Sequence, residues 1–356
     1  MSFTRRAGET LTQRLMHQSI VRFWHVATVL AVVGAAILID APAATVSAAD
    51  LRVMSFNVRV GSADQNTPND WDLRRDHVVQ TVENYNPDLL GLQEDLLYQG
   101  NYIRSGLAGY SKFGRGAEAD GSGEQVSVLY KISRFTPVRQ GSFWLSPTPS
   151  TAGSEFANAE FPRIVNWLEL RDNFSSGLNF VIMNTHWEHG GSDLKDEVRL
   201  RSAALMRSKM TEIAPNLPMI FTGDFNADEG SDPYRRMTSR DGFVETPVDE
   251  TRFLTDTYRN KNSDSATVGT ALGFDGVGTS GRIDWILHDD TSFDTIEAHI
   301  DRTSFIDGAG VKRYPSDHFP INAIIRPTPV PEPATGLSLL GGATAAMMLR
   351  RGRGRR

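Results

Sequence analysis

Short apolar runs recur along the middle of this chain, and most of them are bounded at one end by a carboxylate, an amide or an imidazole. Apolar runs of about four to eight residues between turn signals are typical of buried strands. They cover residues 51–58, 87–94, 125–131, 180–186 and 218–222. Apolar residues at helical spacing predict helices over 72–85 and 195–213. This mixture predicts a layered α/β domain whose strand ends converge on one cleft.

The segment Thr222–Asp228 is the centre of the candidate chemistry, because it follows a buried strand and leads into a turn. Asp224 and Asn226 lie two residues apart and share one strand face, so both polar groups can point at one ligand. A carboxylate and an amide in this arrangement suit a hard metal ion, a phosphate oxygen or an attacking water. Taken alone the motif is weak, since an Asn-Ala-Asp turn is equally well a solvated corner.

The ends of the chain differ from its middle. The chain has 356 residues, and the part from 50 to 326 shows no repeat and no long linker, which predicts one domain there. The absence of cysteine excludes disulfides, thiolate metal sites and cysteine nucleophiles.

Residues 1–49 have the composition of a secretion signal. Four arginines precede the apolar run Val26–Ile39, and a small-residue stretch then ends at Ala49. This order predicts cleavage just before Ala49 or Asp50 during export. The apolar run is shorter than the roughly 20 residues of a membrane-spanning helix. A retained anchor is the alternative.

Residues 327–356 combine a proline-rich linker, an apolar segment from 334 to 349 and five arginines at the end. Basic residues at such an end favour the cytoplasmic side of a membrane. With the motif Pro331-Glu332-Pro333, this order resembles the PEP-CTERM sorting signal of Gram-negative bacteria. The resemblance implies transient membrane contact, removal of the tail and a domain at the cell surface or outside the cell. An ordinary C-terminal membrane anchor is the alternative.

The charge of the middle is more negative than that of the whole chain. The net charge is −6, of which 1–49 contribute +2 and 327–356 contribute +4, leaving −12 for the middle. An acidic surface disfavours general binding to polyanions. A bound divalent cation would reverse the field locally.

Six short motifs, in chain order, resemble those of the endonuclease/exonuclease/phosphatase superfamily, which has the deoxyribonuclease I-like fold. They are Ser55–Arg59, Gly91–Glu94, Asn184–Trp187, Gly223–Asn226, Arg282–Asp284 and Ser316–Pro320. The resemblance spans the whole middle of the chain. It implies a four-layer α/β sandwich of two face-to-face β-sheets flanked by helices.

The resemblance also implies a magnesium site, at which Mn²⁺ is a possible substitute. Glu94 would be the main ligand, helped by Asn57 and, through water, by Asp317. A hard cation with few protein carboxylates keeps positions open for water and phosphate. Asp224 would orient or activate the attacking water, and Asn226 would bind the phosphate.

Two histidines are the implied proton-handling groups, because imidazole titrates near neutral pH. By family pattern, Glu124 would pair with His186, and Asp284 with His318; which histidine is the acid and which the base stays open. Arg163 stands where relatives place an arginine beside the phosphate. His189, which invites assignment as a metal ligand, is interpreted as a rim or structural residue.

The function implied is that of a secreted, Mg²⁺-dependent phosphoesterase, with a nuclease-like phosphodiesterase that uses in-line attack by water favoured. The motifs handle only the phosphate, and the loops choose the rest of the substrate. No basic stripe with interleaved aromatic residues marks a nucleic-acid groove. Two alternatives therefore stay open: a phospholipid or inositol-phosphate phosphoesterase on the same fold, and a non-catalytic domain that binds extracellular polymer. No obligate protein partner is predicted.

Overall fold

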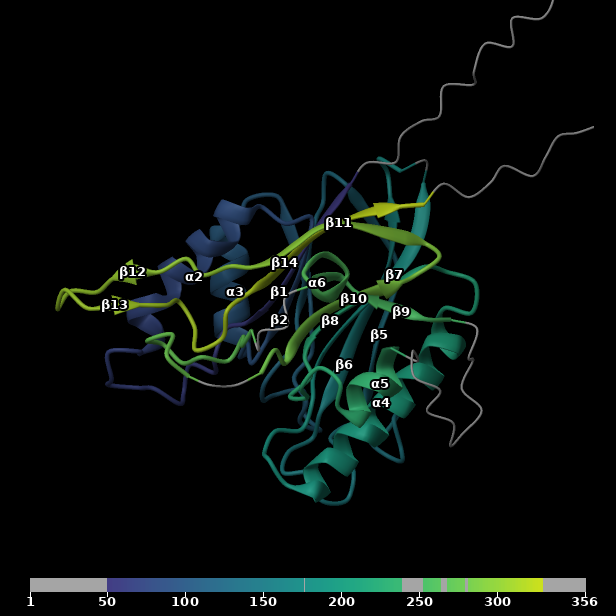
Figure 1. Cartoon of the computed structure of the whole chain (residues 1–356), viewed down its shortest axis with the longest axis horizontal. Helices are drawn as coiled ribbons and strands as arrows, with labels where there is room; N and C mark the ends of the chain where they lie inside the picture. The colour runs from purple at the N-terminus through teal and green to yellow at the C-terminus, as the bar shows by residue number, and fades with distance from the viewer. Residues whose placement is uncertain (1–49, 176, 239–251, 264–267, 279–280, 329–356) are drawn as a thin grey trace, which may run out of the picture. The chain divides into compact units, whose positions relative to one another are not determined.

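The computed structural model describes residues 50–175, 177–238, 252–263, 268–278 and 281–328 (Figure 1). The predicted secretion signal, 1–49, lies outside these ranges, as does the predicted sorting tail apart from residues 327 and 328. Among the described residues, no helix has both the length and the hydropathy that crossing a bilayer requires.

Two mixed six-stranded sheets make up the centre of the fold. The first has the order β11-β14-β1-β2-β4-β3 and contains β1 (Leu51–Asn57), β2 (Leu89–Gln93), β3 (Tyr110–Phe113), β4 (Val128–Lys131), β11 (Phe293–Ile300) and β14 (Ile321–Pro327). The second has the order β5-β6-β7-β8-β10-β9 and contains β5 (Phe135–Trp144), β6 (Ile164–Asp172), β7 (Leu178–His186), β8 (Met219–Asp224), β9 (Leu254–Asp256) and β10 (Asp284–Asp289). A separate ribbon pairs β12 (Phe305–Ile306) with β13 (Lys312–Arg313).

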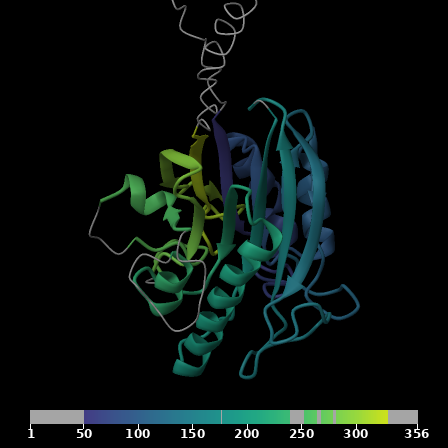
Figure 2. The same ribbon diagram turned by 90° about the vertical axis from the view of Figure 1, so that its right-hand side faces the viewer.

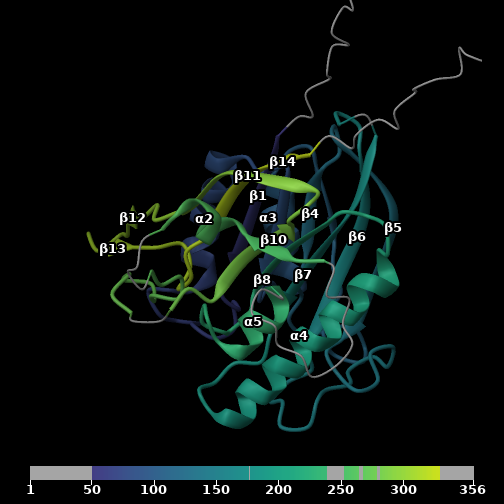
Figure 3. The same cartoon turned by 45° about the vertical axis from the view of Figure 1, so that its right-hand side comes forward.

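Helices cover the outer face of each sheet. The first sheet packs against α2 (Trp71–Tyr85) and α3 (Leu97–Gly106), which lie beside β1 and β2 in Figure 1. The second packs against α4 (Asp193–Ile213) and α5 (Asp232–Thr238), as the turned views in Figures 2 and 3 show. A short helix, α6 (Thr257–Lys261), follows β9. The predicted four-layer α/β sandwich is confirmed.

The alternation of side chains in β1 builds two separate cores. Leu51 and Val53 lie in the core between the two sheets, whereas Met54 and Phe56 pack against α2 and α3. Successive side chains of a strand point to opposite faces, so one strand serves both layers.

Along the strands, the layer between the sheets changes from apolar to polar. On one face of β1, Leu51 and Val53 are followed by Ser55 and Asn57, all of them fully buried. The same change occurs in β7, from Phe180 and Ile182 to Asn184 and His186, and in β8, from Ile220 to Thr222 and Asp224. The polar half of this layer therefore lies at one end of both sheets.

Hydrogen bonds fix the separation of the two sheets at this polar end. Asn184 Nδ2 donates to Leu92 O at 2.6 Å, and Gln93 Nε2 donates to Asn184 Oδ1 at 2.7 Å. The sheets come so close here that a Cβ on Gly91 would collide with the side chain of Thr222. Residues that follow these strands are thus held in a defined relation across the interface.

Candidate active site

Side chains from several strand ends meet at the polar end of the two sheets. β1 ends at Asn57, β7 at His186 and β8 at Asp224, while Glu94 directly follows β2. Because β1 pairs in parallel with β2, and β7 with β8, their carboxyl ends lie at the same edge. β10 runs antiparallel to β8 and begins with Asp284 directly opposite Asp224.

Asn57 joins the two carboxylates at the centre of the site. Its Nδ2 donates to Glu94 Oε1 and to Asp224 Oδ2, both at 2.9 Å. Glu94 Oε2 also accepts from the backbone N–H of Val60 at 2.8 Å. Burial raises the pKa of Glu94, but the neighbouring imidazoles and these hydrogen bonds outweigh it and lower the pKa to about 2. Glu94 is therefore an ionised carboxylate at neutral pH.

Glu94 has the left-handed backbone conformation, with φ of 60°, and so does Asn226, with φ of 47°. Positive φ is uncommon in non-glycine residues, although asparagine adopts it more readily than most, and strained residues gather at functional sites. The backbone N–H of Asn226 donates to Asp224 Oδ1 at 3.0 Å, which helps to hold this conformation.

Asp224 lies between the two histidines. Its Oδ2 is 3.5 Å from His186 Nε2 and 3.7 Å from His318 Nε2. Burial and the nearby carboxylate of Asp284 raise the pKa of Asp224 above its ordinary value. The site thus concentrates a buried negative charge next to two imidazoles.

His318 and Asp284 form a direct hydrogen bond, with 2.9 Å between Nδ1 and Oδ2. Burial lowers the pKa of His318, but the carboxylates of Asp284 and Asp224 outweigh this and raise it well above the ordinary value. With Nδ1 held by Asp284, Nε2 is the atom that faces the site.

His186 is held by Asn226 rather than by Glu124. Asn226 Nδ2 lies 3.0 Å from His186 Nε2 and donates to Trp187 O at 3.1 Å. Glu124 Oε2 lies 3.7 Å from His186 Nδ1, which is a charge contact but too long for a hydrogen bond. The structure therefore places the predicted Glu124–His186 pair together without a hydrogen bond between them.

Asp317 stands apart from the central carboxylates. Its Oδ2 lies 3.6 Å from Arg59 Nη1, and its Oδ1 accepts a hydrogen bond of 3.3 Å from Ser316. Burial raises the pKa of Asp317, and the charge of Glu94 adds to this effect.

Three groups of potential metal-ligating side chains converge among the described residues, and Asp317 belongs to none of them. They are Glu94 with His186 and Asp224, Asp224 with Asp284 and His318, and Glu160 with Glu188 and His189, each with ligand atoms within 4.8 Å of one another. The first group fits a divalent cation, because it presents two buried carboxylates and one imidazole in a compact cluster. Asn57 directs its amide nitrogen at these carboxylates, so its oxygen does not face them.

The third group already has basic side chains beside its carboxylates. Lys195 Nζ lies 2.6 Å from Glu188 Oε1, and Arg163 Nε lies 3.9 Å from Glu188 Oε2. Arg163 Nη2 also lies 3.2 Å from His189 Nδ1. His189 is half-buried and takes part in this ion-pair group, away from the central carboxylates.

Sequence reasoning missed Arg74, which holds two loops of the site together. It is fully buried in α2, and its guanidinium donates to Val58 O at 2.6 Å, Arg59 O at 2.9 Å and Pro315 O at 3.1 Å. Pro315 is two residues before Asp317. An arginine three residues after Trp71, on the buried face of a predicted helix, is the signal that could have revealed it.

Comparison with known protein families identifies the family of the chain. The model of the endonuclease/exonuclease/phosphatase family matches residues 54–318, which include every strand end described above. The chain belongs to the endonuclease/exonuclease/phosphatase family.

Solved structures of this family share the fold. An endonuclease/exonuclease/phosphatase family protein from Bacteroides thetaiotaomicron is 30% identical, with a TM-score of 0.68 over 78% of this chain and 95% of that one. A mannosyl-6-phosphatase from the same species is also 30% identical, with a TM-score of 0.67 over 77% of this chain and 99% of that one. D. rerio TDP2, in complex with a single-strand DNA product, is 17% identical with a TM-score of 0.57 over 78% and 99%, a likeness of fold alone.

Among curated proteins, the chain is 24% identical over 201 residues to an uncharacterised protein of Acanthamoeba polyphaga mimivirus. The match covers 47% of this chain and 29% of that protein's length.

Proposed function

We propose that this protein hydrolyses a phosphate ester with the help of a divalent cation, and that water attacks the phosphorus in line. The observation that carries the proposal is the position of Asp224. Its Oδ2 accepts from Asn57 at 2.9 Å and lies within 3.7 Å of both His186 and His318. Asn57 in turn contacts Glu94, so acid–base groups and a cation site occupy one cluster.

Glu94 would hold the cation, with His186 and Asp224 beside it. We propose Mg²⁺ as that ion, because hard oxygen ligands prefer it, with Mn²⁺ able to replace it. When bound, the cation would draw charge from a phosphoryl oxygen.

The chain's own side chains divide into binding and proton-handling groups. Asn226 Nδ2 lies within hydrogen-bond distance of His186 Nε2 and donates to Trp187 O, so a phosphoryl oxygen bound by this amide would replace one of these partners. His318 directs Nε2 into the site because Asp284 holds Nδ1. Asp224 is placed to accept a proton from the attacking water, and as the ester P–O bond breaks, His318 or His186 would give a proton to the departing alcohol. A general base in such a position contributes about 10²–10⁴-fold to a rate.

Two forms of substrate stay open. The 30% identical relative named a mannosyl-6-phosphatase supports a phosphate monoester. The family resemblance of the sequence favours a phosphodiester such as nucleic acid. The common step, attack of water at phosphorus, needs the same cluster in both cases.

We also propose that the protein is exported through 1–49 and sorted through 327–356. The support is the order of basic, apolar and small residues at one end, and of prolines, apolar residues and arginines at the other. Fractionation of the producing cells, followed by mass determination of the mature chain, tests this: loss of both segments is expected. A cytoplasmic chain of full length would contradict it.

Hydrolysis of two generic esters tests the proposed activity. The purified full chain is incubated with p-nitrophenyl phosphate and with bis-p-nitrophenyl phosphate, with Mg²⁺ or Mn²⁺ and then with EDTA. Release of p-nitrophenol from at least one ester, abolished by EDTA, is expected. No turnover with any divalent ion would favour a non-catalytic domain that binds polymer.

A further inference from the structure

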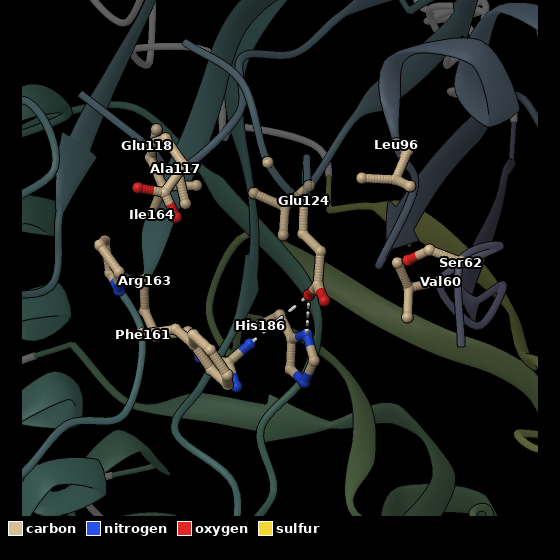
Figure 4. Close-up of a pocket in the computed structure, with 13 residues that line it drawn as sticks. Val60, Ser62, Leu96, Ala117, Glu118, Glu124, Phe161, Arg163, Ile164 and His186 are labelled. Carbon is tan, nitrogen blue, oxygen red and sulfur yellow. Dashed lines mark ion pairs between the residues drawn. The ribbon is translucent and has the colours of Figure 1, made fainter. Parts of the chain in front are cut away.

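A cavity of about 240 Å³ opens beside His186 (Figure 4). Its walls come from the segment after β1, from Leu96, from residues 117–126 and from residues 161–164. Pockets for drug-sized ligands measure roughly 300–1,000 Å³. This smaller cavity therefore suits a molecule of about one ring, attached to a phosphate at the candidate site.

Two buried nitrogen atoms of this cavity's residues, His186 Nδ1 and Arg163 Nε, have no hydrogen-bond partner within the part of the chain that the structure describes. Buried polar atoms are nearly always hydrogen-bonded in folded proteins, so unpaired N–H groups here indicate a ligand with acceptor atoms. Figure 4 shows the Glu124 carboxylate directed at both residues. Its Oε2 lies 3.7 Å from His186 Nδ1 and 3.8 Å from Arg163 Nη1.

This combination of groups suits hydroxyl ligands. A hydroxyl both donates and accepts, so one placed beside Glu124 can donate to the carboxylate and accept from the neighbouring nitrogen atoms. Glu118 and Ser62, on other walls of the cavity, add a carboxylate and a hydroxyl. Several acceptors and donors around one small space match a compound with several hydroxyl groups.

An aromatic ring provides an apolar wall. Phe161 is 49% exposed, and its ring stacks on that of His189 with 6.0 Å between centroids and an interplanar angle of 14°. Val60 and Leu96 also line the cavity. Apolar walls with a few placed polar groups are typical of small-molecule sites. The exposed part of the Phe161 ring can cover the C–H groups of a saturated ring.

The charge of the cavity disfavours a second phosphate. Glu118 and Glu124 are both acidic, and Arg163 is the one arginine or lysine among the described residues of the wall. Its guanidinium already approaches Glu124 at 3.8 Å and Glu188 at 3.9 Å. Binding of a polynucleotide requires a track of cations along its phosphates, and this wall offers none.

We propose that this cavity binds the alcohol part of the substrate, and that this alcohol is a single neutral polyol ring joined to one phosphate. The inference rests on the proposed function, since the candidate site must hold the phosphate. The substrate class is thus a phosphate monoester of a sugar-like ring, and Glu118, Glu124, Phe161 and Arg163 determine the specificity.

Competing substrates test the proposal on the purified full chain with Mg²⁺ or Mn²⁺. The probes are a panel of hexose 6-phosphates, a 5′-mononucleotide, a short single-stranded oligodeoxynucleotide and p-nitrophenyl phosphate. The best hexose 6-phosphate is expected to exceed both nucleic-acid probes in kcat/KM by at least about tenfold, which corresponds to ~1.4 kcal/mol. A nucleic-acid probe with the higher kcat/KM would overturn the proposal and leave the proposed phosphoesterase standing.

Two variants test the assignment of residues. Glu118→Gln and Phe161→Ala are each expected to lower the ratio of kcat/KM for the hexose phosphate to that for p-nitrophenyl phosphate by about tenfold, mainly through KM. Phe161→Tyr keeps the ring and should keep the ratio. Glu83→Gln removes a carboxylate from the exposed side of α2 and is the matched control. Circular dichroism confirms that each variant is folded.

Failure of the assigned cavity and failure of the proposed function would give different results. A ratio that stays constant in both folded variants would overturn the assigned cavity, although the generic ester is still hydrolysed. No hydrolysis of any probe with any divalent cation would overturn the inference and the proposed function together.

Discussion

The two ends of the layer between the sheets are built from the same strands but differ in composition. At one end Leu51, Phe180 and Ile220 fill the space with hydrocarbon. At the other, Asn57 and Asp224 occupy the same faces of β1 and β8. Burial of apolar side chains at the first end stabilises the fold. At the polar end, a buried charge destabilises the fold unless it is paired with an opposite charge or a hydrogen-bonding group. Residues that stabilise the fold and residues of the candidate site thus lie only a few positions apart on the same strands.

The largest effect is expected for Asp224→Asn, at the polar end. The change keeps the shape but removes the acceptor for the proton of water, so kcat should fall at least about a hundredfold. His318→Ala should lower kcat by a similar factor. Because burial penalises the charge of Asp224, the free energy of unfolding should stay the same or rise, as urea titration can measure. A variant with wild-type kcat would show that Asp224 does not accept the proton of water.

Phe180→Ala, at the apolar end, should lower the free energy of unfolding and leave kcat unchanged. The ring is fully buried and packs edge-on against Phe135 and Phe293, with centroids 5.8 Å and 6.4 Å away. The lost contacts and the cavity should lower the free energy of unfolding by about 3–5 kcal/mol. Below the unfolding transition, kcat per folded molecule should match that of the wild type. A loss of kcat comparable with that of Asp224→Asn would show that the two ends are not separable.

Arg74→Met should lower both kcat and the free energy of unfolding, each to a smaller degree than the two changes above. Methionine keeps the packing against Trp71 and Phe274 but leaves the carbonyls of Val58 and Pro315 without this donor. We expect a loss of about 1–3 kcal/mol in the free energy of unfolding, together with a lower kcat. Unfolding and rate measurements on one preparation provide the check. An increase in stability with unchanged kcat would refute the role of Arg74 in holding the loops.

The smallest effect concerns Glu229, on the rim, which pairs with Arg259 and with Arg282 Nη2 at 3.1 Å. Burial raises the pKa of Glu229, but both arginines outweigh it, so the folded-state pKa lies below the ordinary 4.5. Stability from this group is therefore present above pH 4.5 and is lost as the pH falls through the lower folded value. Compared with wild type, Glu229→Gln should be less stable near pH 6, and this deficit should shrink as the pH falls below 4.5 through the lower folded value. A difference independent of pH would contradict the ion-pair account.

The fold and the positions of several polar strand ends were predictable because their signals are local. Apolar periodicity located α2 and α4 within two residues of their starts, and Asn57, His186 and Asp224 are polar residues that end apolar runs. The resemblance then indicated how these ends meet.

Other features depend on distant contacts and were not predictable. β5 is exposed or half-buried over most of its length, so no apolar run marks it, and it depends on pairing with β6. The predicted strand over 125–131 begins at 128 in the structure, since Gln125 instead forms isolated bridges to Asp95 and Gly116. The separation of Glu124 from His186 depends on the loop 116–124, where Ala117 N donates to Glu124 O at 3.0 Å. Local sequence contains no signal for that geometry.

In the proposed function, Glu94 and its neighbours act around one divalent cation. The most direct test is the rate of ester hydrolysis as a function of Mg²⁺ concentration, for the wild type and for Glu94→Gln. Loss of a charged ligand should raise the Mg²⁺ concentration for half-maximal rate at least about tenfold, since even neighbours of metal ligands affect metal affinity by roughly 10–100-fold. An unchanged Mg²⁺ dependence in a folded Glu94→Gln protein would show that Glu94 does not hold the cation.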